Sequence, residues 1–285
     1  MNTKKNNNID ISIIIPQKNS LCTIPRLFAS IPDTNRVEII LVDNSDVPVK
    51  KEDIKVSRDF KLLWASPSRF AGGARNEGMK VANGKWLLFA DADDFFTKDA
   101  FDLFFSLVND DADIIYFGMT GIYSDTGENS RRGEYYTNMV KNYLAGKITE
   151  EKMRFLFGTP CSKMIKRELV EKYNLLYDEV VVCNDSYFST TCGYYANKIK
   201  AIDHPVYVAT VTRGSLTRRT DFVARHSKYL VTLRINKFLR DKNQGAYQIP
   251  IASYIKESLK FGISRTMLML WEAIKYKQNI FIKLK

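Results

Sequence analysis

Long apolar runs are missing from this chain of 285 residues, and histidine and clustered cysteines are scarce. No stretch reaches the roughly 18–20 apolar residues with which a helix crosses a bilayer. The first eight residues, MNTKKNNN, do not lead into the apolar segment and cleavage site of a secretory signal. The four cysteines show no paired spacing, and His204 and His226 lie far apart, so no zinc motif or disulfide framework is indicated. These absences predict a protein of the reducing cytoplasm.

Basic charge is concentrated at one end of the chain. The whole sequence carries 43 Lys and Arg against 32 Asp and Glu, a net charge of +11. Residues 213–285 hold 16 basic and 4 acidic residues, so the preceding part holds 43 − 16 = 27 and 32 − 4 = 28. Hydrophobic residues at 45% and charged residues at 26% are ordinary for a globular protein. The composition indicates a nearly neutral globular domain followed by a basic segment.

Strand and helix patterns alternate in the first third of the sequence. Continuous Ile, Val and Leu runs are typical of strands covered on both faces, and their alternation with short helices predicts a mainly parallel sheet. The expected strands are Asp10–Pro16, Arg36–Asp43, Lys61–Ala65 and Trp86–Ala90, with helices at Pro25–Ser30 and Ala74–Ala82.

The remaining sequence predicts a more decorated region and then helices. The expected elements are an antiparallel part with Asp113–Met119 and Gly133–Thr137, helices at Glu150–Phe157, Lys166–Lys172 and Asp185–Ala196, a strand at Val206–Val211, and a mainly helical segment from Phe222 with a break at Gln248–Pro250.

Three carboxylates, Asp91, Asp93 and Asp94, follow an apolar strand directly. On an extended backbone Asp91 and Asp93 point to one side, where two carboxylates repel unless a cation lies between them. Such oxygen ligands suit Mg²⁺ or Mn²⁺ shared with substrate phosphates. The same acids also fit a strand end, with Asp94 or Thr97 capping a helix that begins near Lys98.

Other polar motifs fall at the carboxyl ends of expected strands, where parallel sheets bind ligands. They occupy residues 16–19, 43–44 and 72–75. Arg75 follows two glycines and opens the expected helix, and a glycine approach, an Arg and a helix N-terminus together favour phosphate. A solvated helix charge is the other interpretation of Arg75.

These segments resemble glycosyltransferase family 2, inverting enzymes with the GT-A fold. The matching stretches lie within about residues 10–215 and read IIIP (13–16), EIILVD (38–43), GARNEG (73–78), ANGKWLLFADADD (82–94), KMIKR (163–167) and NDSYF (184–188). The resemblance implies an α/β fold of GT-A type, with a Rossmann-like, mainly parallel sheet flanked by helices and a C-terminal helical extension.

The resemblance also implies an organisation along the chain. We expect a flexible N-terminus (1–9), a GT-A domain (10–215) and a basic helical extension (216–285). Within the domain, the nucleotide-sugar half spans about 10–97 and the acceptor half about 98–215.

The nucleotide-sugar site is assigned by the same resemblance. Pro16, Asp43, Arg75 and the segment Asp91-Ala92-Asp93 line it. Asp43 meets the uracil or ribose, and Asp91 and Asp93 match the family's DxD motif. Asp93 ligates a divalent metal, Mn²⁺ or Mg²⁺, and Asp91 contacts ribose or metal-bound water. The implied donor is a UDP-sugar.

Asp185 resembles the aspartate of the family's Glu-Asp-x-x-Phe motif, with Phe188 in the usual aromatic place, and the resemblance implies that Asp185 is the catalytic base. It removes the proton of an acceptor hydroxyl, and a single displacement inverts the anomeric centre. From the residues alone, an N-cap at a helix start is the alternative. The implied acceptor is a glycan, or a lipid-linked glycan, of bacterial surface polysaccharide. Three positions depart from the family pattern, namely Lys18 for an aromatic, Asn44 for a second acid and Asn184 for a glutamate.

The basic segment carries an amphipathic pattern between Ser264 and Asn279. Met267, Leu270, Trp271 and Ile274 share one helical face near several Lys and Arg. This pattern fits contact with the inner face of the cell membrane, or packing of the stripe on the catalytic domain. Arg218 and Arg219 contact phosphate or belong to a solvated loop. A nucleotidyltransferase and a basic nucleic-acid-binding protein remain alternatives, although no nucleic-acid recognition motif is present and no such partner is expected.

Overall fold

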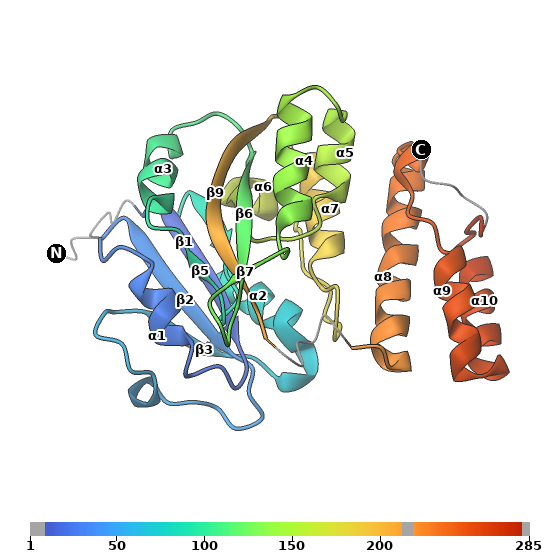
Figure 1. The fold of residues 1–285 in the computed structure, drawn as a ribbon, viewed down its shortest axis with the longest axis horizontal. Coiled ribbons are helices and arrows are strands. Elements are labelled where there is room, and N and C mark those ends of the chain that lie inside the picture. Colours follow the sequence, from blue (N-terminus) through green and yellow to red (C-terminus); the bar gives the residue numbers. More distant parts are fainter. Residues whose placement is uncertain (1–8, 213–218, 281–285) are drawn as a thin grey trace.

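The computed structural model describes residues 9–212 and 219–280, and within them nine strands form a single sheet. The strand order is β3-β2-β1-β4-β8-β6-β9-β5, with β7 paired to β6. Strands β1 to β4 run parallel to one another, β8 is antiparallel to both neighbours, and β6 is parallel to β9. Figure 1 shows helices on both sides of this sheet. The prediction of an α/β fold with a mainly parallel sheet is confirmed.

The elements of the first part include the predicted strands and helices, close to their predicted bounds except at the start of the second helix, together with further short elements. They are β1 (Ile11–Gln17), α1 (Ile24–Ala29), β2 (Val37–Asp43), η1 (Lys51–Asp53), β3 (Lys61–Trp64), η2 (Pro67–Arg69), α2 (Phe70–Lys80), β4 (Trp86–Phe89), β5 (Phe95–Phe96) and α3 (Ala100–Leu107).

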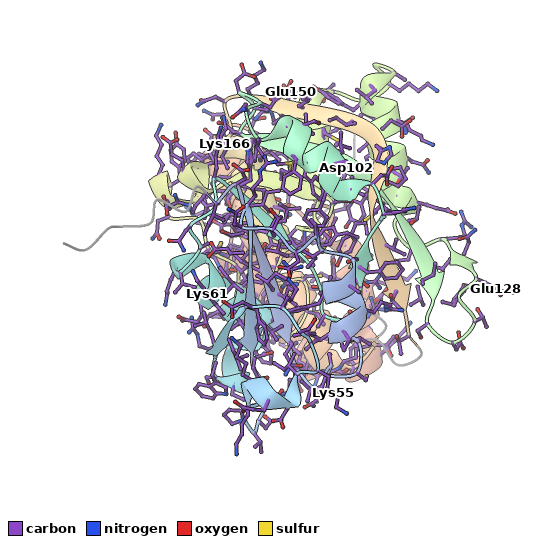
Figure 2. All side chains as sticks on the ribbon, turned by 90° about the vertical axis from the view of Figure 1, so that its left-hand side faces the viewer. Lys55, Lys61, Asp102, Glu128, Glu150 and Lys166 are labelled. Atoms are coloured by element: carbon purple, nitrogen blue, oxygen red, sulfur yellow. The ribbon has the colours of Figure 1, made fainter. Side chains whose placement is uncertain are left out.

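The later elements mix strands with more helices. They are β6 (Ile114–Tyr123), β7 (Asn129–Ser130), α4 (Glu134–Leu144), α5 (Glu150–Leu156), β8 (Lys163–Lys166), α6 (Arg167–Lys172), α7 (Ser186–Tyr195), β9 (Ile199–Val211), α8 (Phe222–Asp241), η4 (Gly245–Tyr247), α9 (Ala252–Ser258), η5 (Leu259–Phe261) and α10 (Ile263–Lys275). Figure 2 shows Glu128, between β6 and β7, projecting away from the body of the molecule.

The two faces of the sheet form separate cores because side chains alternate along each strand. Ile13 and Ile15 of β1 lie in the core covered by α1 and α3. Ile14 points to the other face, which α2 and α4–α7 cover. Both cores use strands that are fully buried, so the apolar sequence runs lack strict alternation of polar and apolar residues.

Helix α2 differs from its prediction because it begins at Phe70, not Ala74. The glycine pair therefore lies inside the helix, and Arg75 lies in its second turn rather than at its N-terminus. A Cβ on Gly72 would collide with the carbonyl oxygen of Asp178. The glycines thus allow a close approach between α2 and the segment before α7, not a phosphate-binding loop.

Two further predictions were wrong. Gly133–Thr137 is not a strand, because α4 begins at Glu134, and Tyr136, Met139, Val140 and Tyr143 pack into the core at helical spacing. Helix α3 has Asp99 at its N-cap position, so neither Asp94 nor Thr97 caps it.

The C-terminal helices form one end of the molecule (Figure 1). Helix α8 packs against the domain through Val231, Ile235 and Leu239, which cluster with Phe155 of α5. Helices α9 and α10 pack on α8 through a separate small core. Within the described ranges, every helix is too short or too polar to cross a membrane. The expectations for residues 1–8, Arg218 and the last five residues lie outside the described residues.

Candidate active site

The acidic segment after β4 forms a tight turn, in which the Asp94 backbone N–H donates to the Asp91 carbonyl at 3.0 Å. The expectation of an extended backbone was therefore wrong. The alternation of side chains along a strand does not determine where these carboxylates point. Tyr207 of β9 fixes the turn, since its hydroxyl accepts from the Asp91 N–H (2.9 Å) and donates to Asp94 (2.8 Å). Asp94 also accepts from the Thr210 N–H at 2.6 Å and is buried, so it is a structural residue of the turn.

Asp93 differs from Asp91, because no Lys or Arg in the part of the chain that the structure describes forms an ion pair with it, and from Asp94, which accepts hydrogen bonds from Tyr207 and Thr210. Burial, and then the nearby Asp91 carboxylate, raise the pKa of Asp93. Arg26 donates to its backbone carbonyl, not to its carboxylate, at 2.5 Å. The Asp93 carboxylate is consequently the acid of this turn that is available to a cation.

Arg75 links the acidic turn to the start of α7. Its guanidinium donates to Asp91 at 2.5 Å and to the Asn184 side chain at 2.8 Å, and it lies 5.3 Å from the Tyr177 ring centroid. The residue is only 5% exposed, so a solvated helix charge is excluded. Burial by itself lowers the pKa of Arg75, but Asp91 and the other acidic groups nearby, Asp185 among them, together outweigh burial, and the pKa of Arg75 is raised. Arg75 is therefore a buried cation that neutralises one of the two DxD acids.

Asp185 occupies the N-cap position of α7, but its side chain caps no backbone N–H of the helix. The preceding Cys183 has a φ of 60°, in the left-handed region, which turns the chain sharply before Asn184. Burial raises the pKa of Asp185, while the positive charge of Arg75 opposes this rise. Arg75 bonds both Asp91 and Asn184, the residue before Asp185, so the start of α7 lies next to the acidic turn. The expected base and the DxD motif are thus brought together from distant parts of the sequence.

Asp43 and Pro16 lie at the same edge of the sheet, at paired ends of β2 and β1. Asp43 is buried and its oxygens accept from Gln17 Nε2 (2.6 Å), the Ser45 N–H (3.0 Å) and the Val49 N–H (2.8 Å). These bonds show that Asp43 organises the loop after β2. Its predicted contact with a nucleotide stays a prediction.

Sequence reasoning gave no role to two buried residues near the site, Tyr207 and Lys163. Lys163 is 2% exposed, donates to the Phe157 carbonyl at 2.6 Å and lies over two aromatic rings. Burial lowers the pKa of Lys163 to about 7, although Asp185 and two cysteines oppose the shift. Tyr207 is 113 residues from Asp94 in sequence, and no spacing signal connects them.

The residues fit a divalent metal that is shared with a substrate. In residues 9–212 and 219–280, no three Asp, Glu, His or Cys side chains form a metal-binding group by themselves. Mg²⁺ commonly takes only one or two protein carboxylates and completes its coordination with phosphates and water. Asp93, with Asp91 beside it, supplies such a partial set, and like-charge repulsion between them favours a bound cation.

Comparison with known proteins identifies the class of protein to which this fold and acidic turn belong. Residues 12–174 match the sequence profile of Glycosyl transferase family 2. The match covers more than half of the chain, and the protein belongs to this family. The predicted resemblance is confirmed.

Two relatives come from Bacillus subtilis. EpsH is 23% identical over 194 residues, which cover 65% of this chain and 55% of EpsH. The uncharacterised glycosyltransferase EpsJ is 27% identical over 223 residues, which cover 73% of this chain and 62% of EpsJ. The chain thus spans somewhat more than half the length of these relatives.

Solved structures share the fold. Residues 1–349 of S. aureus TarS in complex with UDP-GlcNAc superpose with a TM-score of 0.64 at 17% identity, covering 97% of this chain and 95% of that one. The mannosyltransferase PcManGT of Pyrobaculum calidifontis, in complex with GDP-Man and Mn²⁺, gives 0.55 at 15% identity, covering 94% and 81%. These similarities establish the GT-A fold, as predicted, with the C-terminal helices included in the match.

Proposed function

We propose that this protein is an inverting glycosyltransferase that moves a sugar from a UDP-sugar to a hydroxyl of a glycan acceptor in bacterial surface polysaccharide synthesis. The observation that carries the proposal is the Arg75 bridge, which joins the acidic turn at Asp91 to Asn184, next to Asp185. A nucleotidyltransferase needs the acids but has no use for a base at this position. Membership of the family supports sugar transfer over that alternative.

Asp185 is the proposed general base. Its carboxylate accepts the proton of the acceptor hydroxyl while that oxygen forms a bond to the anomeric carbon. The bond from this carbon to the diphosphate oxygen breaks with its electron pair, and the nucleoside diphosphate leaves. Burial raises the pKa of Asp185 and thereby strengthens it as a base, while Arg75 keeps the deprotonated form accessible.

Asp93 and Asp91 are the proposed residues that hold Mn²⁺ or Mg²⁺ together with the donor diphosphate. The bound metal supplies Lewis-acid stabilisation of the leaving diphosphate. Arg75 and Tyr207 keep the acidic turn in one conformation, so that the carboxylates need no rearrangement when the donor binds. Pro16, Asp43 and Ala92 are buried around the same edge and shape the proposed nucleotide pocket.

The donor and acceptor classes are supported by the names of similar proteins. TarS binds UDP-GlcNAc in its solved complex, and a relative with the same name is a poly(ribitol-phosphate) β-N-acetylglucosaminyltransferase. The chain also matches GgaB, a minor teichoic acid biosynthesis protein, at 25% identity over 62% of the length of this chain. A UDP-sugar donor and a cell-envelope glycan acceptor are the corresponding proposals here, with the reaction on the cytoplasmic side of the membrane.

Donor hydrolysis tests the proposal. UDP-, GDP- and dTDP-sugars are incubated with the protein and Mn²⁺ or Mg²⁺, and nucleotide release is measured for wild type, Asp93→Asn and Asp185→Asn. Asp59→Asn is the matched control, because Asp59 is an exposed aspartate of the loop before β3. We expect metal-dependent release of one nucleotide, retained in the control.

The two active-site variants separate the proposed roles. Asp93→Asn should lose metal-dependent donor binding in calorimetry, whereas Asp185→Asn should bind the donor and lose turnover by roughly a hundredfold or more. A wild-type protein that binds no sugar nucleotide with either metal would refute the function. Full turnover in Asp185→Asn would refute the assignment of the base.

A further inference from the structure

A row of large apolar side chains lies open to solvent along η5 and α10. Its members are Leu259, Ile263, Met267, Trp271 and Ile274, which are between 57% and 75% exposed. Spacings of four, four and three residues place Ile263, Met267, Trp271 and Ile274 on one side of α10, while Leu259 precedes the helix in η5. We call this row the apolar face of α10. It includes three of the four residues of the stripe predicted from the sequence, and since these three are exposed, packing of the stripe on the catalytic domain is excluded for them.

The opposite side of α10 is anchored on α8, which fixes the direction of the apolar face. Met269 and Ala273 are buried against Tyr229 and Leu233 of α8. The Tyr229 hydroxyl donates to the Met269 carbonyl at 2.6 Å. These contacts hold α10 on α8 in one rotation about its axis. The apolar face must therefore meet either water or a binding partner.

The C-terminal helices that carry the apolar face are rich in positive charge. Residues 219–280 contain 12 Lys and Arg against 4 Asp and Glu. The basic residues on α9, η5, α10 and the turn that follows are Lys256, Lys260, Arg265, Lys275 and Lys277.

The two acids of the same region are both paired toward α8. Glu257 forms an ion pair with Arg225 at 3.3 Å, and Glu272 contacts His226 at 2.9 Å. The Lys275 Nζ lies 5.2 Å from the Trp271 ring centroid, so an ammonium group sits at the border of the apolar face. The surface combines exposed apolar groups with basic residues, while its two acids are engaged with residues of α8.

We propose that the apolar face of α10 docks this protein on an anionic lipid surface, with the helix lying in the plane of the interface. The apolar side chains would enter the region between head groups and acyl chains, while the lysines pair with lipid phosphates. Figure 1 shows α9 and α10 on the far side of α8 from the sheet, so a flat surface reaches them without contacting the sheet. This inference stands beside the proposed function and does not depend on it.

Charge complementarity favours lipid over a second copy of the chain. A two-fold dimer through this face would bring the same lysine-rich rim against itself, because both subunits use one patch. An anionic membrane instead supplies the opposite charge and an apolar layer at once. For a helix of 13 residues, the interface is about 20 Å long.

Vesicle sedimentation with the full chain tests the proposal. The probes are phosphatidylcholine vesicles with and without phosphatidylglycerol. The apolar variant carries Met267→Ser, Trp271→Ser and Ile274→Ser. Its matched control changes three exposed apolar residues elsewhere, namely Val47→Ser, Tyr135→Ser and Leu144→Ser.

A second pair of variants tests the charges without altering the apolar face. The charge variant carries Lys260→Gln, Lys275→Gln and Lys277→Gln, and its control carries Lys55→Gln, Lys147→Gln and Lys172→Gln at other exposed lysines. Thermal melting checks that each variant is folded. Two independent variants probe the same surface. If the apolar variant loses helix stability, the charge variant still tests the proposal.

Wild type should sediment with the anionic vesicles and weakly or not at all with phosphatidylcholine alone, and added salt should release it. One lysine near an anionic surface strengthens binding about fivefold, so the charge variant should bind on the order of a hundredfold more weakly. The apolar variant should bind the anionic vesicles at least about tenfold more weakly than wild type, and the affinity of both controls should stay within about twofold of wild type.

Three results would overturn the proposal. They are no sedimentation of wild type with anionic vesicles, unchanged binding of both the apolar and charge variants, and a dimer in sedimentation equilibrium that the apolar variant abolishes while vesicles bind no protein. Donor hydrolysis in solution is measured on the same samples and should be equal in all variants, since none of these residues belongs to the active site. A failure of lipid binding is thereby distinguished from a failure of the proposed enzymatic function.

Discussion

Replacing Arg75 by methionine tests whether the buried guanidinium holds the active site together. The substitution keeps an unbranched side chain but removes the hydrogen bonds to Asp91 (2.5 Å) and Asn184 (2.8 Å). Breaking one side of a buried ion pair typically costs 3–5 kcal/mol, because a charge remains without compensation. The Asp91 side chain is 37% exposed and can be partly hydrated. We therefore expect a loss near the lower limit, about 3 kcal/mol of unfolding free energy.

The assay is urea unfolding followed by circular dichroism, with sugar-nucleotide calorimetry on the folded variant. Arg69→Met is the control, since Arg69 also pairs with carboxylates, Glu77 and Glu179, but is partly exposed. That change should cost about 1 kcal/mol or less. Arg75→Met should in addition weaken metal-dependent donor binding, because Asp91 and Asn184 lose the group that orders them.

A double variant isolates the electrostatic part of the effect. Asp91→Asn removes the charge that Arg75→Met leaves uncompensated, so the double variant should be more stable than Arg75→Met alone. It should nevertheless remain deficient in donor binding. If Arg75→Met is no less stable than Arg69→Met, or if Asp91→Asn makes it still less stable, the argument from a buried charge pair is wrong.

Three more substitutions probe the surroundings of the site. Burial lowers the pKa of Lys163 from 10.5 to about 7. Between these two pH values the unfolded chain binds a proton at Lys163 that the folded chain lacks. The stability of the wild type should therefore rise with pH across this window. Lys163→Met should remove up to about 1.4 kcal/mol per pH unit of that rise in urea titrations, and an equal slope in both proteins would contradict the burial argument. Gly72→Ala should lower the unfolding free energy by about 1–3 kcal/mol, because the added Cβ meets the Asp178 carbonyl. The control Gly245→Ala, whose Cβ makes only an ordinary contact, should change it by no more than about 0.5 kcal/mol. Equal melting temperatures of the two variants would argue against the close approach of α2. Tyr207→Phe removes the hydroxyl that joins Asp91 and Asp94, and it should lower the unfolding free energy by about 1–3 kcal/mol and weaken metal-dependent donor binding. Donor affinity equal to wild type in this variant would show that the acidic turn does not need the hydroxyl.

The parallel half of the sheet could be predicted because its strands are buried on both faces. The centres of β1 and β2 (residues 13–15 and 39–42) and the whole of β4 read as continuous apolar runs, a pattern typical of strands covered on both faces. The start of α4 could not be predicted in this way. Its first residues, Glu134 to Thr137, contain two tyrosines and suit a strand locally, and only the burial of Met139 and Val140 against the sheet makes them helical.

The amphipathic pattern of α10 was also visible in the sequence, but its orientation was not. Periodicity identifies a face and does not say what the face meets. Met269 and Ala273 compete for the same core, and their contacts with α8 turn Met267 and Trp271 outward. The exposed face is therefore a result of helix packing.

Sequence alone determined the family, the sheet and the candidate acids, because runs of apolar residues and the order of short motifs are properties of contiguous chain. Tertiary structure decided what each acid does. Asp91 is paired with Arg75, Asp94 is enclosed by Tyr207 and Thr210, and Asp93 is left available, although all three look alike in the sequence. The reason is physical, because the charge and solvation of a carboxylate depend on neighbours that come from distant strands and helices and that only folding brings within hydrogen-bonding distance.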